Sequence, residues 1–107
     1  ANLVDANLSG ASLTRANLVR ARLSGSTLAH ADLGLANLAF ASLTRADLAH
    51  ANLSRANLAR ATLVDVNLSG TNLAHANLAG VTSSGITGTP SALPAGWRLV
   101  NGRLVHK

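Results

Sequence analysis

Histidine, aspartate and arginine are the side chains of this 107-residue chain that could carry chemistry. The chain has four histidines, four aspartates and no cysteine. His30 and His50 supply two imidazoles, which is half of a zinc site. Asp32 and Asp47 are expected to serve bends in the chain, so no third ligand joins the pair. With no glutamate, and no nucleophile matched to a base and an orienting group, the sequence also lacks the parts of a catalytic site. We therefore expect no metal, no cofactor and no enzymatic activity.

A strict five-residue repeat must position these side chains. Leucine occupies every fifth position from Leu3 to Leu78, sixteen times in succession. The residue two places before it is alanine in thirteen of the sixteen repeats, and the residue between them is usually Asn, Asp, Ser or Thr. The positions of each repeat are numbered one to five below, with leucine third.

The five-residue spacing excludes both a helix and a flat strand. On an α-helix a step of five residues turns the side chain by about 140°, so the leucines would spiral over every face. In a flat strand an odd period places successive leucines on opposite faces. Within one repeat the alanine and the leucine share a face, and a bend in every repeat turns the next pair inward again. The chain must therefore coil into a solenoid whose circuits stack about 4.8 Å apart.

These repeats resemble those of the pentapeptide repeat family, whose motif has a central Leu or Phe, a small residue two places before it and a polar residue between. The resemblance covers residues 1–80. It implies an all-β fold, a right-handed quadrilateral parallel β-helix with four repeats per coil, and hence about four coils for this chain. In that fold His30 and His50 share a column, one coil apart. We expect the pentapeptide repeat solenoid to extend over residues 1–89.

The residues that follow the repeats predict a different element. Two prolines and a glycine interrupt regular structure. Residues 97–105 are typical of a hairpin around an Asn-Gly turn, in which Leu99 lies opposite Leu104. We expect residues 90–107 to lie over the last coil as a C-terminal cap. The expected cap residues are Trp97, Leu99, Asn101, Gly102 and Leu104.

Position five of each repeat points outward and varies most, so this position is where a function could be encoded. With four sides, residues twenty apart stack in columns, and two adjoining columns combine basic and apolar side chains. This candidate partner-binding surface consists of Arg15, Arg20, Leu35, Phe40, Arg55 and Arg60. It suits phosphate or a carboxylate-rich protein surface. The alternative is that outward arginine keeps a β-rod soluble and discourages edge pairing.

The net charge of +5 is spread unevenly along the chain. Residues 1–89 hold six arginines and four aspartates, a charge of +2, and residues 90–107 add two arginines and one lysine. Nucleic-acid binders usually cluster many more basic residues, often with aromatic residues for stacking, so we expect no nucleic-acid partner. The expected function is a non-enzymatic structural or protein-interaction scaffold with an unknown protein partner.

A second candidate function comes from the resemblance alone. Some members of the family are acidic, dimeric mimics of DNA that inhibit DNA gyrase. Such a mimic needs a stripe of carboxylates in place of phosphates and a C-terminal helix for dimerisation. Here arginine outnumbers aspartate, and the predicted hairpin stands where that helix would be. The mimic therefore ranks below the scaffold.

The compartment and the chain ends give further expectations. Neither a run of eighteen apolar residues nor a signal peptide is seen, and we expect a bacterial, cytoplasmic protein without a membrane span. The start at Ala1, in phase with the repeat, indicates an excerpt of a longer repeat protein, a processed chain or an engineered solenoid. We expect the first coil to be uncapped and to allow end-to-end self-association.

A core leucine and an outward arginine should respond differently to substitution. We expect Leu38→Asp to destroy cooperative unfolding, because it places an unpaired charge in the shaft. Arg45→Ala should barely move the melting temperature. Thermal unfolding followed by circular dichroism compares the two, and equal effects would show that inside and outside are wrongly assigned.

Overall fold

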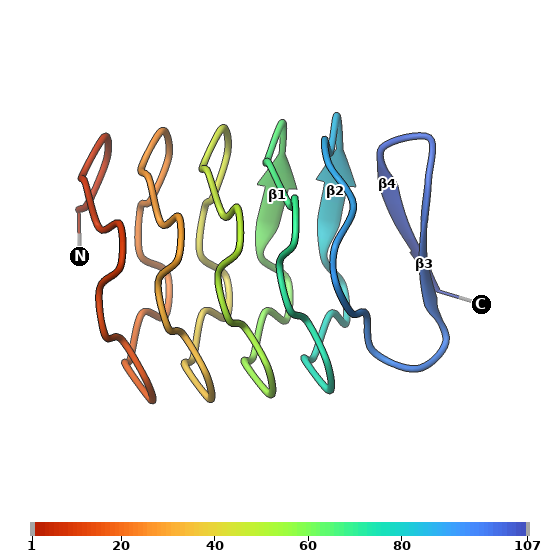
Figure 1. Ribbon diagram of the computed structural model, residues 1–107, viewed down its shortest axis with the longest axis horizontal. Coiled ribbons are helices and arrows are strands. Elements are labelled where there is room, and N and C mark those ends of the chain that lie inside the picture. The colour runs from red at the N-terminus through yellow and green to blue at the C-terminus, as the bar shows by residue number, and fades with distance from the viewer. Residues whose placement is uncertain (1, 107) are drawn as a thin grey trace.

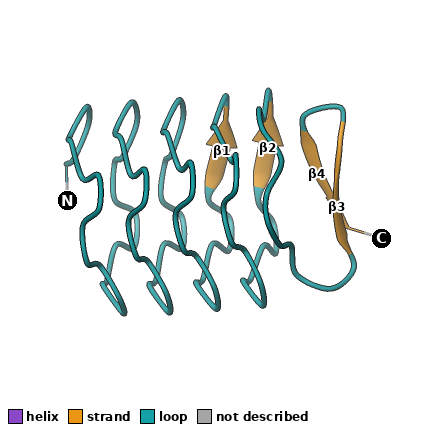
Figure 2. Cartoon of the chain, viewed as in Figure 1, coloured by secondary structure: helices purple, strands orange, loops and turns teal. Residues whose placement is uncertain are grey.

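The computed structural model describes residues 2–106. Most of the chain winds around one axis in stacked coils, and two strands near the C-terminus lie at one end of the stack (Figure 1). Strands β1 (Thr62–Val64) and β2 (Thr82–Ser84) pair in parallel, whereas β3 (Trp97–Val100) and β4 (Arg103–His106) form an antiparallel hairpin. The remaining described residues form loops, turns and single bridges, and no helix is present in Figure 2. Among residues 2–106 there is accordingly no apolar helix able to cross a bilayer.

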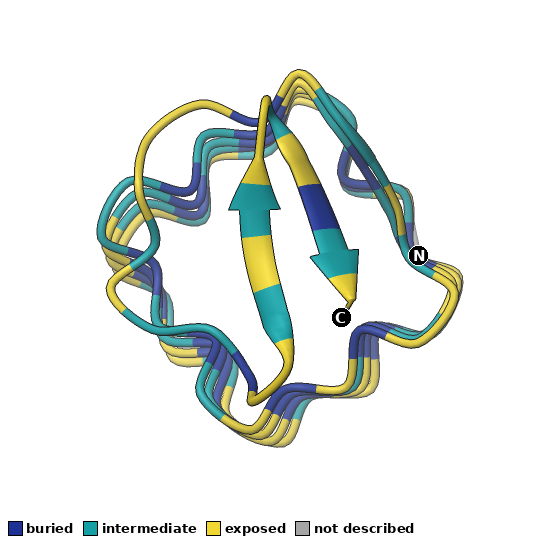
Figure 3. Ribbon diagram, turned by 90° about the vertical axis from the view of Figure 1, so that its right-hand side faces the viewer, coloured by how far each residue is buried: buried dark blue, intermediate teal, exposed yellow. Residues whose placement is uncertain are grey.

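Residues twenty apart lie side by side throughout the wound part of the chain. Single parallel bridges join Asn2 to Arg22, Arg22 to Ser42 and Ser42 to Thr62, and the pairing of β1 with β2 continues this row. Equivalent rows follow the second positions of the other three sides, the last bridge joining Asn72 to Ala92. Each coil therefore contains four repeats, and Figure 3 shows its four-sided outline end-on.

Three of the five backbone amides in a repeat bond to neighbouring coils. The N–H groups of Leu38 and Phe40 donate to carbonyls of the following coil at 2.7 and 2.9 Å. The N–H of Asn37 donates to a carbonyl of the preceding coil at 2.9 Å. The same pattern recurs from repeat to repeat, so the coils are joined on all four sides by short hydrogen bonds along the axis.

The other two amides form the corner between one side and the next. The N–H of Ala41 donates to the Leu38 carbonyl at 3.0 Å, and the N–H of Ala39 donates to Oδ1 of Asn37 at 3.2 Å. The second-position side chain thus serves the bend, as its residue type predicts. Phe40 is the third residue of this turn and has a φ of 62°, a left-handed value typical of type II turns.

Glycine is the residue that such a corner favours, yet most corners lack it. Gly10, Gly25, Gly70 and Gly80 occupy fifth positions with positive φ. Twelve other fifth positions hold non-glycine residues with φ between 59° and 65°. A left-handed conformation costs an L-residue with a side chain about 1–2 kcal/mol. The outward residues are therefore held in a conformation that the rest of the coil imposes.

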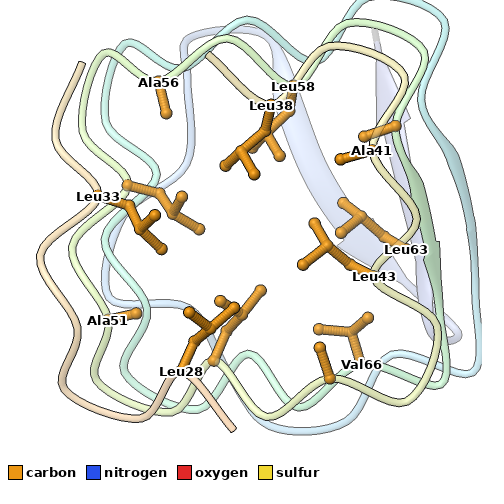
Figure 4. Close-up of a cluster of buried hydrophobic side chains, with 14 of the residues drawn as sticks. Leu28, Leu33, Leu38, Ala41, Leu43, Ala51, Ala56, Leu58, Leu63 and Val66 are labelled. Atoms are coloured by element: carbon orange, nitrogen blue, oxygen red, sulfur yellow. The ribbon is translucent and has the colours of Figure 1, made fainter. Parts of the chain in front are cut away.

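Leucine and the small residue at position one fill the shaft, as the close-up in Figure 4 shows. Twelve leucines, from Leu23 to Leu78, are no more than 1% exposed. Val66, Thr71 and Ile86 replace alanine at position one and are also buried. The leucines of the first three repeats are only half-buried, because this end of the stack has a neighbouring coil on one side only. Inside and outside are thus assigned as the repeat predicts.

The hairpin of β3 and β4 lies across the end of the shaft (Figure 3). Leu99 pairs with Leu104 in the register that the Asn-Gly turn predicts. The carbonyl of Gly102 accepts a hydrogen bond from the N–H of Ile86 at 3.0 Å, and the N–H of Leu104 donates to Oγ of Ser83 at 2.8 Å. Leu104 is 7% exposed and belongs to the core.

The remaining predicted hairpin residues take different places. Trp97 is half-buried and stacks on the His106 ring, with 4.8 Å between centroids, so the hairpin buries Leu104 more deeply than its largest side chain. Asn101 and Gly102 form the turn, both with positive φ. The division of the chain into residues 1–89 and 90–107 remains a prediction, and its two outermost residues lie outside those described.

Candidate partner-binding surface

Two neighbouring corners of the rod bring the predicted surface residues together. Position five at one corner carries Arg15, Leu35, Arg55 and His75, and at the next corner Arg20, Phe40, Arg60 and Gly80. Leu35 and Phe40 are 44% and 49% exposed, which is unusual in a chain whose other large apolar side chains are mostly buried. The side of the rod that includes both corners is called the basic face below. It consists of residues 15–20, 35–40, 55–60 and 75–80.

Phe40 lies between two arginines of its own column. The guanidinium carbon of Arg20 is 5.1 Å from the ring centroid and that of Arg60 is 5.9 Å from it. One arginine comes from the coil before Phe40 and the other from the coil after it. Both distances lie within the range of cation–π attraction, which contributes about 0.5–1 kcal/mol at exposed sites. The ring thus holds two guanidinium groups against the surface of the rod.

A row of four asparagines runs along the middle of the basic face. Asn17, Asn37, Asn57 and Asn77 are bridged one to the next. The Oδ1 atom of each accepts the backbone N–H two residues later, at 3.0–3.2 Å. The turn uses one of the two lone pairs of each oxygen, and the Nδ2 group adds two N–H donors.

Two rows on other sides of the rod differ because they contain aspartate. Nδ2 of Asn52 donates to Asp32, and Nδ2 of Asn67 donates to Asp47, each at 3.2 Å. The asparagine row of the basic face contains no carboxylate to accept such a bond. Sequence reasoning missed this row. It placed Arg20, Phe40 and Arg60 in one column but did not foresee the contact of both guanidinium groups with the ring. The signal was present as asparagine, arginine and phenylalanine at twenty-residue intervals.

Charge is segregated around the rod. The basic face carries four of the six arginines of residues 1–89 and none of the four aspartates, a charge of +4. The other sides hold Arg22, Arg45 and all four aspartates, a charge of −2, which together with +4 gives the +2 of this segment. An approaching charged partner therefore meets opposite fields on different sides of the rod.

The two histidines that share a column stack on each other. The rings of His30 and His50 are 5.1 Å apart at an interplanar angle of 12°. The neighbouring members of their column are Gly10 and Gly70, which bring no ligand. Within residues 2–106 no group of three or more His, Cys, Asp or Glu residues is placed to hold a metal ion.

The interior offers no space for a ligand. No pocket is found over the part of the chain that the structure describes, in keeping with the close filling of the shaft by leucine. The basic face is where the exposed apolar and charged side chains coincide.

The chain has the features of a parallel β-solenoid repeat protein, namely stacked twenty-residue coils, a shaft filled with leucine and corners that point outward. The family model for pentapeptide repeats matches residues 1–39 and 41–80, in eight copies. The chain belongs to the pentapeptide repeat family.

Several solved structures resemble the chain. The pentapeptide repeat protein Rfr23 from the cyanobacterium Cyanothece 51142 is 37% identical with a TM-score of 0.79, and the match covers 82% of this chain and 60% of that one. HetL from Nostoc sp. strain PCC 7120, a protein involved in regulating heterocyst differentiation, is 35% identical with a TM-score of 0.79, over 86% and 42% of the two chains. Another Nostoc PCC 7120 pentapeptide repeat protein is 35% identical with a TM-score of 0.80, over 86% and 77%.

This chain thus spans 60% of the length of Rfr23 and 42% of that of HetL. Comparison with curated protein sequences gives no match.

The arginine–phenylalanine stack predicts an energetic coupling that a double-mutant cycle measures. For Phe40→Leu combined with Arg20→Ala we expect a coupling of about 0.5–1 kcal/mol in the free energy of unfolding, because each single change removes the same contact. The control cycle pairs Phe40→Leu with Arg15→Ala, at the other corner, and should give no more than about 0.3–0.5 kcal/mol. Urea unfolding followed by circular dichroism supplies the values. Equal couplings in both cycles would contradict the stack.

Proposed function

We propose that this chain is a non-enzymatic scaffold that binds a protein partner through its basic face. The observation that carries the proposal is the coincidence, on one side of a solid rod, of exposed Leu35 and Phe40 with four arginines. Aromatic residues and arginine are enriched at protein interfaces. The regulatory role named for HetL, a relative with the same fold, is in keeping with a protein that acts by binding.

The rigidity of the rod suits a protein that presents surface side chains to a partner and does not catalyse a reaction. Its coils are joined by hydrogen bonds on every side, and its interior is filled. Corner residues of successive coils are therefore held at a fixed spacing, which lowers the entropic cost of presenting several side chains to one partner. Carboxylates are not presented in a comparable stripe, since Asp32 and Asp47 accept hydrogen bonds from their own turns and from asparagines. This leaves the DNA-mimic function with less support than the scaffold.

The finer architecture is part of the same proposal. We infer a right-handed solenoid of about four coils, in which the β3–β4 hairpin caps the C-terminal end of the shaft. The contacts of Gly102 and Leu104 with the last coil support this role for the hairpin.

The cap predicts that Leu104 matters more than the exposed side chains of the hairpin. Leu104→Ala should lower the free energy of unfolding by about 2 kcal/mol, because it leaves a cavity over the last coil. The control Val100→Ala changes a residue of the same hairpin that is 38% exposed and should cost about 0.5 kcal/mol or less. Chemical denaturation of both variants tests this, and a neutral Leu104→Ala would rule out the cap.

A selection experiment tests the proposed binding surface. A phage-displayed peptide library without charge bias is panned against the wild-type chain. We expect the enriched peptides to lose binding to the double variant Leu35→Ser/Phe40→Ser, because the exposed apolar side chains of the basic face are removed.

The same peptides should keep their binding to the control Val4→Ser/Val100→Ser, which removes two similarly exposed side chains away from that face. Circular dichroism shows whether each variant is folded. Peptides that bind both variants equally, or a library without enrichment, would overturn the assignment.

A further inference from the structure

We propose that the basic face recognises an acidic segment of polypeptide, rich in Asp and Glu, that lies along the rod axis. The inference rests on the proposed function and names the chemistry of the partner. It is drawn from the hydrogen-bonding character of the face, the arrangement of its rows and the surroundings of Phe40.

Hydrogen-bond donors outnumber acceptors among the side chains of the basic face. Arginine has five N–H donors and no acceptor. Each asparagine of the row accepts a turn N–H at Oδ1 and carries two N–H donors on Nδ2. Position four on this side is occupied by valine or alanine, which have no polar side-chain atom. His75 and the asparagine oxygens can also accept, but the charged groups of the face only donate. A partner that satisfies such a surface must supply acceptors, and an ionised carboxylate is a side chain that only accepts.

The donors are arranged in rows parallel to the axis. Successive asparagines of the central row are one coil apart, about 4.8 Å, and the two arginines of each corner are two coils apart, about 10 Å. Arginine binds carboxylates through two parallel N–H···O bonds, and the stacking of Arg20 and Arg60 on Phe40 restrains both groups before a partner arrives. A chain of carboxylates along the axis therefore meets donors at every coil. The other sides of residues 1–89 carry a net charge of −2, which disfavours the same segment there.

The surroundings of Phe40 favour carboxylates over nucleic acid. Proteins that bind single strands stack bases on exposed aromatic rings. Here one guanidinium group from the coil before and one from the coil after lie 5.1 and 5.9 Å from the centroid of the Phe40 ring, where they compete with a stacking base. The exposed surface of Phe40 and Leu35 is available to an apolar side chain among the acids.

Fluorescence anisotropy tests the proposal with three labelled probes. The probes are a peptide that alternates pairs of glutamate with leucine, its lysine counterpart, and a single-stranded DNA of equal charge. We expect the chain to bind the acidic peptide, with an affinity that falls as salt is raised. DNA binding equal to or tighter than that of the acidic peptide would overturn the proposal, as would no binding of the acidic peptide.

Charge-matched variants locate the binding site. Arg20→Ser/Arg60→Ser should weaken binding of the acidic peptide about tenfold, whereas Arg22→Ser/Arg45→Ser removes the same charge from other sides and should change it less than about twofold. Asn57→Asp puts a carboxylate into the donor row while keeping the turn acceptor, and should also weaken binding. Its control, Asn72→Asp, should not. Equal losses within either pair would show that net charge, and not the basic face, attracts the peptide.

The two proposals fail in different ways. Panned peptides that require Leu35 and Phe40 but carry no excess of Asp and Glu would leave the scaffold function standing and overturn the acidic partner. A library without any enrichment, together with an acidic peptide that binds all variants alike, would overturn both.

Discussion

The hydrogen bonds that join each repeat to the coil beside it are the constraint on which the rest of the structure depends. Leu38 illustrates it, since its N–H reaches a carbonyl of the next coil at 2.7 Å while its side chain fills the shaft. Once this bond recurs on four sides, the pitch of the coil is fixed by strand pairing. This pitch produces the columns of outward residues and the rows of second-position side chains. It also brings the leucines of successive coils together into a solid interior. The basic face exists because residues far apart in sequence share a column.

The sequence predicted the winding of the chain but not every detail of it. A leucine at every fifth position excludes a helix and a flat strand, and it separates inside from outside correctly at Leu38 and Phe40. The same spacing is compatible with three or four sides, because coils of either shape stack at the same distance. The twenty-residue coil therefore came from the family resemblance. The Asn-Gly turn set the register of the hairpin, whereas the deeper burial of Leu104 than of Trp97 depends on how the hairpin lies on the last coil, which no local pattern encodes.

The residues of the candidate site were predictable from the sequence. Their side-chain contacts and the hydrogen-bonding character of the surface were not. Columns of position five placed Arg20, Phe40 and Arg60 together, but the contact of both guanidinium groups with one ring depends on side-chain conformation. Within a single repeat, each asparagine of the row is only a residue type that is common in turns. Its excess of N–H donors emerges only when Oδ1 is known to accept the turn N–H and the row is known to contain no aspartate. Likeness to Rfr23 and HetL establishes the fold, and the proposal of a partner rests on the outward residues of this chain.

The left-handed corners have a consequence for how the rod tolerates change. Glycine relieves backbone strain at position five, so replacement of an outward side chain by glycine is locally downhill in free energy unless another contact opposes it. Gly10 and Gly80 are corners without this backbone strain. Phe40 does carry the strain, and its contacts with the guanidinium groups of Arg20 and Arg60 oppose its replacement by glycine. The Arg20, Phe40 and Arg60 corners therefore keep side chains at positions where glycine would have less backbone strain. Corners with glycine present no side chain to the outside, so the two kinds of corner differ both in strain and in the surface that they present.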